Sequence, residues 1–251
     1  METLSSTVPA LPLFFLMFLF IYLVALFGVF RNWNPKLRPE ASSCSISLAH
    51  GTPAVFLAAF AILKVDQSQR GFASPNTSFQ NTVLDFSIAY FLMDLLHFLI
   101  FFPSDLLFIG HHLATLFVFL TCRYMVFHGA FAILVLLILA EITSGCQNIW
   151  TLANARRADL PAAARLYELL SPPFYAFYSV VRGLAGPSFV YKMGVFYASG
   201  AADNVIPRWV SLSWLVVVVM AISVSILWVS HLWLDLYRER SSKKLEKKKT
   251  T

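Results

Sequence analysis

Long apolar runs recur along the whole chain. Seven of them approach the roughly 20 residues that an α-helix needs to cross the hydrocarbon core of a bilayer. They are residues 9–30, 46–63, 83–102, 106–124, 130–150, 174–195 and 209–236. None alternates polar and apolar side chains as a membrane β-strand does. The pattern predicts an all-α multi-pass membrane protein with about seven transmembrane helices, the first of which is a retained anchor.

The composition agrees with a chain solvated by lipid. Of the 251 residues, 58% are hydrophobic and 13% are charged. A soluble domain carries about 25% charged residues, whereas a disordered chain combines low hydrophobicity with high net charge. Both of these classes are therefore excluded.

The distribution of positive charge predicts the orientation of the helices. With a luminal N-terminus, thirteen of the 19 Lys and Arg residues lie on the cytosolic side, including seven between Arg238 and Lys249. Cytosolic loops of membrane proteins carry an excess of Lys and Arg. We therefore expect a luminal N-terminus and a cytosolic basic tail.

Two short motifs fit this orientation. Asn76-Thr77-Ser78 is a sequon for N-glycosylation and falls in a predicted luminal loop. The C-terminal residues Lys248-Lys249-Thr250-Thr251 resemble the dilysine signal that returns membrane proteins to the endoplasmic reticulum. We therefore expect a glycan at Asn76, residence in the endoplasmic reticulum membrane and recognition of the tail by coat proteins. The expected organisation is an anchor and cytosolic loop over 1–39, a helical domain over 40–240 and a tail over 241–251.

Polar and ionisable side chains interrupt four of the predicted spans at helical spacing. Such groups cost roughly 2.5–3.5 kcal/mol each at the centre of a bilayer, so they face a protein interior or a cavity. They are Tyr90, Asp94 and His97; His111, His112 and Thr115; Glu141, Ser144 and Asn148; and Tyr175, Tyr178 and Arg182. Because adjacent residues on a helix differ by about 100°, only one of His111 and His112 can face the interior.

These four sets lie at a similar distance from the predicted cytosolic ends of their spans. The common depth predicts a polar cavity that opens to the cytosol and receives membrane lipids. For any single residue a structural role remains equally open, since an Asp–His or Glu–Arg contact also pins helices together.

The sequence gives little indication of a disulfide, metal or phosphate-binding site. The three cysteines, Cys44, Cys122 and Cys146, form no Cys-x-x-Cys pair, and no His-x-x-x-His pair or phosphate-binding loop is present. We expect no metal, no permanently bound cofactor and no nucleic-acid partner. His50 and His231 stand alone in their spans, so neither is given a functional role.

The polar motifs together resemble those of the TLC-domain family, which includes TRAM, the ceramide synthases and the CLN proteins. The motifs are Tyr90 to Asp94, His97, His111 to Thr115, and Ala140 to Ser144. The resemblance covers about residues 40–240 and implies a helical bundle that encloses a polar cavity. It also implies a role in lipid homeostasis.

The resemblance implies acyl transfer as one activity, with acyl-CoA as co-substrate. His111 or His112 would be the general base, Asp94 or Glu141 its orienting carboxylate, and Arg182 would stabilise negative charge. Lipid- or cofactor-binding roles would fall to Tyr90, His97, Thr115, Ser144, Asn148 and Tyr178. Ceramide synthases carry a His-Asp pair and a further Asp where this chain has Ala140-Glu141 and Ser144. Ceramide synthesis is therefore not expected.

Three other functions remain open from the sequence. A non-catalytic lipid binder would use the same polar cluster to hold a headgroup. A translocation or cargo-handling accessory would resemble TRAM or CLN proteins. A proton-coupled transporter would use the intramembrane Asp, Glu and Arg, although no inverted repeat supports it.

Overall fold

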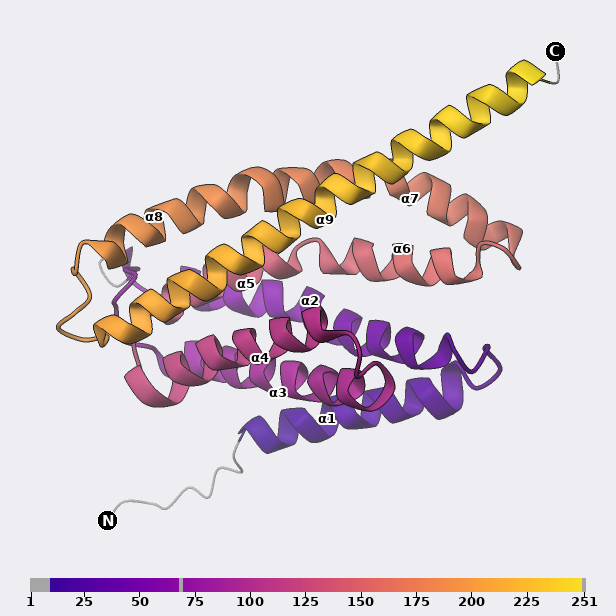
Figure 1. Ribbon diagram of the computed structural model, residues 1–251. Helices are drawn as coiled ribbons and strands as arrows, with labels where there is room; N and C mark the ends of the chain where they lie inside the picture. Colours follow the sequence, from indigo (N-terminus) through magenta and orange to yellow (C-terminus); the bar gives the residue numbers. More distant parts are fainter. Residues whose placement is uncertain (1–9, 68–69, 250–251) are drawn as a thin grey trace.

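The computed structural model describes residues 10–67 and 70–249, with side chains as far as residue 238. Helices make up nearly all of this part of the chain (Figure 1). They are α1 (Ala10–Val24), η1 (Ala25–Val29), α2 (Arg38–Leu63), α3 (Ser78–Phe101), α4 (Leu106–Leu120), η3 (Thr121–Val126), α5 (Ala130–Glu141), α6 (Ser144–Arg156), α7 (Pro161–Val180), η4 (Val181–Ala185), α8 (Gly186–Ala198) and α9 (Arg208–Lys249). The three η segments are π-helical turns that continue their neighbours.

The helices group into seven passes along one bundle. In Figure 1, α5 and α6 together make one pass, and α7, η4 and α8 make another beside α9. Within the described residues, six helices are long and apolar enough to cross a membrane. They are Ala10–Val29, Arg38–Leu63, Ser78–Phe101, Leu106–Val126, Ala130–Arg156 and Arg208–Arg238. The prediction of an all-α multi-pass membrane protein is confirmed.

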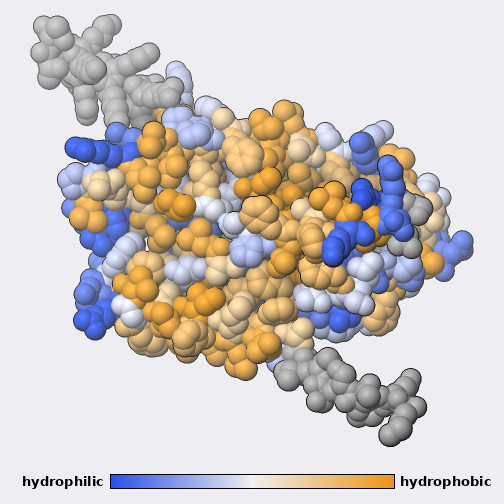
Figure 2. Space-filling view, turned by 180° about the vertical axis from the view of Figure 1, so that it is seen from behind, coloured by the Kyte–Doolittle hydropathy of each residue, from blue (hydrophilic) through white to orange (hydrophobic). Residues whose placement is uncertain are grey.

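The surface has the character that a bilayer requires. Figure 2 shows hydrophobic side chains across the middle of the molecule and hydrophilic ones toward its two ends. Large apolar side chains such as Phe20, Phe56, Ile100 and Leu227 are more than half exposed. In water this exposure would be unfavourable, whereas lipid tails solvate such side chains.

The second helix begins earlier than hydropathy predicts. The expected start was residue 46, but α2 begins at Arg38, with Pro39 in its first turn. Proline suits this position because its fixed φ is helical and its missing N–H has no partner there. The serines between these points lower the hydropathy, yet Ser43 faces inward and bonds to Asp94.

The sixth pass also differs from the prediction. The expected span was 174–195, but the helix already begins at Pro161 and continues through Pro172 and Pro173. This pass is not among the six that satisfy the membrane criterion. Phe174 and Tyr178 of α7 pack with Trp228 of α9, which holds the pass against the rest of the bundle.

The third helix is the centre of the bundle and carries several of the polar residues. It packs against α1, α2, α4 and α5, and it is the most buried of the six membrane-spanning helices. Thr77 caps its start, because its side chain accepts from the backbone N–H of Gln80 while the Gln80 side chain accepts from that of Thr77. Polar groups on α3 therefore meet protein rather than lipid.

Candidate functional site

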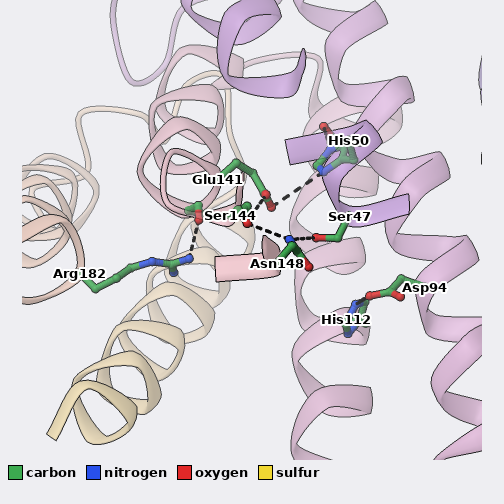
Figure 3. A network of polar contacts seen from close by, with 10 residues as sticks. Ser47, His50, Asp94, His112, Glu141, Ser144, Asn148 and Arg182 are labelled. Carbon is green, nitrogen blue, oxygen red and sulfur yellow. Dashed lines mark hydrogen bonds and ion pairs between the residues drawn. The ribbon is translucent and has the colours of Figure 1, made fainter. Parts of the chain in front are cut away.

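Polar side chains from six elements meet inside the bundle in two neighbouring groups (Figure 3). The Asp94 group contains Ser43 of α2, Asp94 of α3 and His112 of α4. The Glu141 group contains His50 of α2, Glu141 of α5, Ser144 and Asn148 of α6, and Arg182 of η4. Figure 3 shows Glu141 and Ser144 lying between Arg182 on one side and His50 and Ser47 on the other.

In the Asp94 group every polar atom has a partner. His112 Nε2 lies 2.9 Å from Asp94 Oδ2. Ser43 Oγ donates to Asp94 Oδ1 at 2.7 Å, and His112 Nδ1 lies 2.8 Å from the carbonyl oxygen of Phe108. Asp94 and His112 are both buried, each with 4% of its surface exposed. These bonds join α2, α3 and α4.

This pairing leaves His112 without a free lone pair. A carbonyl oxygen only accepts, so Nδ1 of His112 must carry the proton that bonds to Phe108. Its Nε2 then either donates to the Asp94 carboxylate or accepts from the protonated acid. In neither state can His112 accept a proton from a substrate without breaking a buried bond.

His111 is placed differently. It is exposed, whereas His112 is buried, as the 100° rotation between adjacent residues predicts. Its ring lies edge-on to His112, with ring centroids 5.6 Å apart, and it interacts electrostatically with His112, Arg182 and Asp94. Among the described residues neither of its ring nitrogens has a hydrogen-bond partner. Of the two candidate bases, His111 is therefore the one with free nitrogens.

The Glu141 group surrounds a break in a membrane-spanning helix. The sequence predicts one helix over 130–150, but α5 ends at Glu141 and α6 begins at Ser144. In a continuous helix the N–H of Ser144 would bond to the carbonyl oxygen of Ala140. Arg182 Nη2 donates to that oxygen, at 2.6 Å. A cation at the carboxyl end of α5 also suits the helix dipole.

The carboxylate at the break has one close partner. Ser144 Oγ donates to Glu141 Oε2 at 2.6 Å, whereas His50 Nδ1 lies 3.9 Å from Glu141 Oε1. Three buried atoms in this region lack a hydrogen-bond partner, namely His50 Nδ1, Thr143 Oγ1 and Arg182 Nε. Glu141 also interacts electrostatically with Arg182, Asp94 and His112, which places the two groups in one region.

Tyr90 connects the two groups. Its ring stacks on His50, with centroids 4.0 Å apart and planes 7° apart, and its hydroxyl group interacts electrostatically with both Asp94 and Glu141. Ser47 Oγ of α2 accepts from Asn148 Nδ2 at 2.8 Å. The predicted stripes on α3 and α6 therefore meet through α2.

A TLC-domain family model matches residues 40–234. This chain belongs to the TLC-domain family. It is similar to the TLC domain-containing protein At5g14285 of Arabidopsis thaliana, with 63% identity over 241 residues, which cover 95% of this chain and 94% of that protein. No solved structure matches. Both polar groups of this TLC-domain protein lie within the matched residues.

The remaining predicted residues lie at the edges of the two groups. His97 Nδ1 lies 2.8 Å from the hydroxyl oxygen of Tyr22, so α1, outside the matched residues, also contributes to the polar interior. The guanidinium group of Arg182 lies over the ring of Tyr178, 5.3 Å from its centre. Thr115 is half-buried on α4 and takes no part in the hydrogen bonds of either group in the described structure.

Sequence reasoning missed the contribution of the second span. Ser43, Ser47 and His50 all face the polar interior. They stand at i, i+4 and i+7, which is the spacing that identifies Tyr90, Asp94 and His97 on the third span. The same spacing would identify them, although His50 is the one ionisable residue within the predicted span 46–63.

The sequon residue Asn76 is engaged in structure at the opposite end of the bundle. Its Nδ2 donates to the carbonyl oxygen of Cys122 at 3.0 Å and to Asn81 Oδ1 at 3.3 Å. Its Oδ1 accepts from the N–H of Ala130 at 2.9 Å. A glycan replaces one hydrogen of Nδ2, so it would compete with one of these bonds. Glycosylation of Asn76 stays a prediction.

Proposed function

We propose that this TLC-domain protein acts in lipid homeostasis in the endoplasmic reticulum membrane. It binds a lipid in its polar interior and transfers an acyl chain from acyl-CoA to that lipid. The observation that carries the proposal is the position of His111, which has free ring nitrogens and whose ring centroid lies 5.6 Å from that of His112 in the buried Asp94–His112 pair.

In this mechanism His111 is the general base. It removes the proton from the hydroxyl or amine of the acceptor lipid, a step that contributes typically 10²–10⁴-fold to a rate. The Asp94–His112 pair fixes α3 against α4 and thereby holds His111 in place. Arg182, with Nε unpartnered, supplies positive charge for the developing oxyanion or for a phosphate of coenzyme A.

The proposed orientation makes acyl-CoA available to this site. In this orientation the loops 31–37 and 157–160 and the basic tail face the cytosol, where acyl-CoA is found, and the excess of Lys and Arg on that side of the chain supports it. The N-terminus is then luminal. The dilysine signal lies at the end of α9, and its side chains fall outside the described residues.

The test is an acyl-CoA turnover assay on the full-length protein purified in detergent, combined with mass spectrometry of copurifying lipids. Wild-type protein is expected to release coenzyme A, and His111→Gln is expected to reduce the rate at least tenfold. His231→Gln is the matched control, because His231 is an exposed histidine on α9. Unchanged release by His111→Gln contradicts the role of His111.

The complete pairing of Asp94 and His112 favours a second candidate, a lipid binder without chemistry. A saturated polar pair can hold helices around a lipid and needs no reactive atom. Under this alternative a lipid copurifies with the protein, but no coenzyme A is released by wild-type protein.

A further inference from the structure

We propose that Ser144 is a nucleophile that carries the acyl chain as an ester between the donor and the acceptor. This inference rests on the acyl transfer proposed above and divides it into two half-reactions. Ser144 is half-buried at the first position of α6, directly after the helix break. Three features of its surroundings support the assignment.

The first feature is a base in direct contact with the hydroxyl group. Ser144 Oγ donates to Glu141 Oε2 at 2.6 Å. O–H···O⁻ bonds of 2.5–2.7 Å are charge-assisted and strong. The carboxylate is therefore positioned to take the proton when Ser144 Oγ forms a bond to carbon.

The second feature is a set of backbone donors beside the hydroxyl group. The first backbone bond within α6 runs from the N–H of Gln147 to the carbonyl oxygen of Thr143. The N–H groups of residues 144–146 therefore have no acceptor within α6. Arg182 also donates to the carbonyl oxygen of Ala140, so its positive charge lies at the same break. Such amides at the start of a helix stabilise an oxyanion.

The third feature is independent of the helix end. His50 and Thr143 are completely buried, and His50 Nδ1 and Thr143 Oγ1 lack hydrogen-bond partners. Unpartnered buried polar atoms are rare and call for an explanation. His50 Nδ1 faces Glu141 Oε1 at 3.9 Å, so a shift of about 1 Å would form a hydrogen bond. His50 is thus placed to accept from Glu141 once that carboxylate is protonated.

The first half-reaction follows from these positions. Ser144 Oγ attacks the carbonyl carbon of the acyl thioester, and its proton passes to Glu141. The amides of residues 144–146 stabilise the resulting oxyanion. The carbon–sulfur bond then breaks, and the coenzyme A thiolate takes the proton from Glu141 and leaves as a thiol.

The second half-reaction regenerates the serine. The oxygen or nitrogen of the acceptor lipid replaces Ser144 Oγ on the carbonyl carbon. The acceptor gives one proton to His111, and His111 then returns that proton to Ser144 Oγ as the serine leaves the carbonyl carbon. The acyl chain ends on the lipid and the protein returns to its starting state.

Ser43 provides a comparison with Ser144. Ser43 Oγ donates to Asp94 Oδ1 at 2.7 Å, so it is also a serine bonded to a buried carboxylate. However, Ser43 lies inside α2, where the helix occupies the backbone amides, and His112 occupies the other oxygen of Asp94. Ser43 is therefore not expected to react.

The experiment detects the ester directly. Full-length protein in detergent is mixed with radiolabelled palmitoyl-CoA without acceptor lipid, quenched in acid and analysed by peptide mass spectrometry. We expect an acyl ester on the peptide that contains Ser144 in wild type and in His111→Gln alike, because without acceptor lipid only the first half-reaction runs. Ser144→Ala should carry at least tenfold less label than wild type, whereas Ser223→Ala, at an exposed serine of α9 that bonds to the carbonyl oxygen of Val219, should keep it.

A conservative variant guards against loss of folding. Ser144→Cys should form a thioester, which neutral hydroxylamine cleaves and which the serine ester resists. Two outcomes overturn this inference and leave the proposed function intact. One is equal labelling of Ser144→Ala and wild type. The other is release of coenzyme A by wild type while His111→Gln carries no ester on Ser144. Absence of coenzyme A release from wild type contradicts the proposed function itself.

Discussion

Two chains of serine, carboxylate and histidine lie side by side in this protein and differ in how fully they are bonded. In Ser43–Asp94–His112 both carboxylate oxygens and both ring nitrogens have partners. In Ser144–Glu141–His50 the serine bonds to the carboxylate, but the histidine nitrogen lies 3.9 Å away and has no partner. The first arrangement is suited to joining helices, and the second to reacting.

The backbone explains the difference. Ser43, Asp94 and His112 lie inside unbroken helices, whose backbone groups bond to one another. Glu141 and Ser144 flank the break between α5 and α6, where the regular helix is interrupted for two residues. A polar group inside a membrane is expensive unless it is bonded, so the incompletely bonded group is the better indicator of function.

The largest effect on stability is expected for His112→Ala. It removes one partner of a buried pair and leaves Asp94 with Ser43 alone. Breaking such a pair costs about 3–5 kcal/mol. Unfolding in detergent should show this loss, and His231→Ala should not. A His112→Ala protein as stable as wild type would contradict the structural role of the Asp94 group.

Removing the Asn76 side chain should also destabilise the protein, because it too leaves polar groups without partners, at the opposite end of the bundle. Asn76→Ala removes four hydrogen bonds, one of them a long one to Cys122 Sγ, and leaves the N–H of Ala130 without its partner, which should cost about 2 kcal/mol. Ser78→Ala is the control, because it destroys the sequon without touching Asn76. If the two variants are equally stable, the amide network is unimportant. A gel mobility shift that only wild type shows would confirm glycosylation.

Gly51→Ala should disturb the Glu141 group, and its main effect should be on acyl labelling. A methyl group on Gly51 would lie 2.8 Å from Glu141 Oε2 and 2.9 Å from Ser144 Cβ, so the pair must move. We expect at least a tenfold loss of acyl labelling with a stability cost of about 1–2 kcal/mol. Gly194→Ala is the control, since its nearest neighbour would be 3.9 Å away. Equal labelling of both variants would contradict the geometry proposed for Ser144.

The smallest effect is expected for Tyr22→Phe. It removes the hydroxyl group that bonds to His97 and keeps the ring. One such bond contributes about 0.5–1.5 kcal/mol, and acyl transfer should be unchanged. Thermal unfolding and coenzyme A release measure the two quantities. A large loss of activity would instead place α1 in the reactive part of the site.

The sequence identified most of the site residues because ionisable groups are conspicuous among apolar ones. Asp94, His112, Glu141 and Arg182 could be selected on this basis. A serine is a weaker signal than an ionisable residue, because a hydroxyl group costs little in a membrane helix when it bonds to its own backbone. Ser43 and Ser47 were given no role from the sequence, and their bonds to Asp94 and Asn148 reveal it.

The sequence by itself determined the membrane class and the helical architecture, because run length and hydropathy act along a single helix. It also determined that one of His111 and His112 faces inward, since helical rotation is local. Only the tertiary structure decided which histidine keeps free nitrogens and where the fifth pass breaks. His112 is bonded by Asp94 of α3 and by Phe108 of its own helix, which leaves His111 with the free nitrogens. Arg182 of η4 bonds to Ala140 beside the break in the fifth pass. Packing between helices brings Asp94 and Arg182 to these positions, and the sequence of a single helix does not specify it.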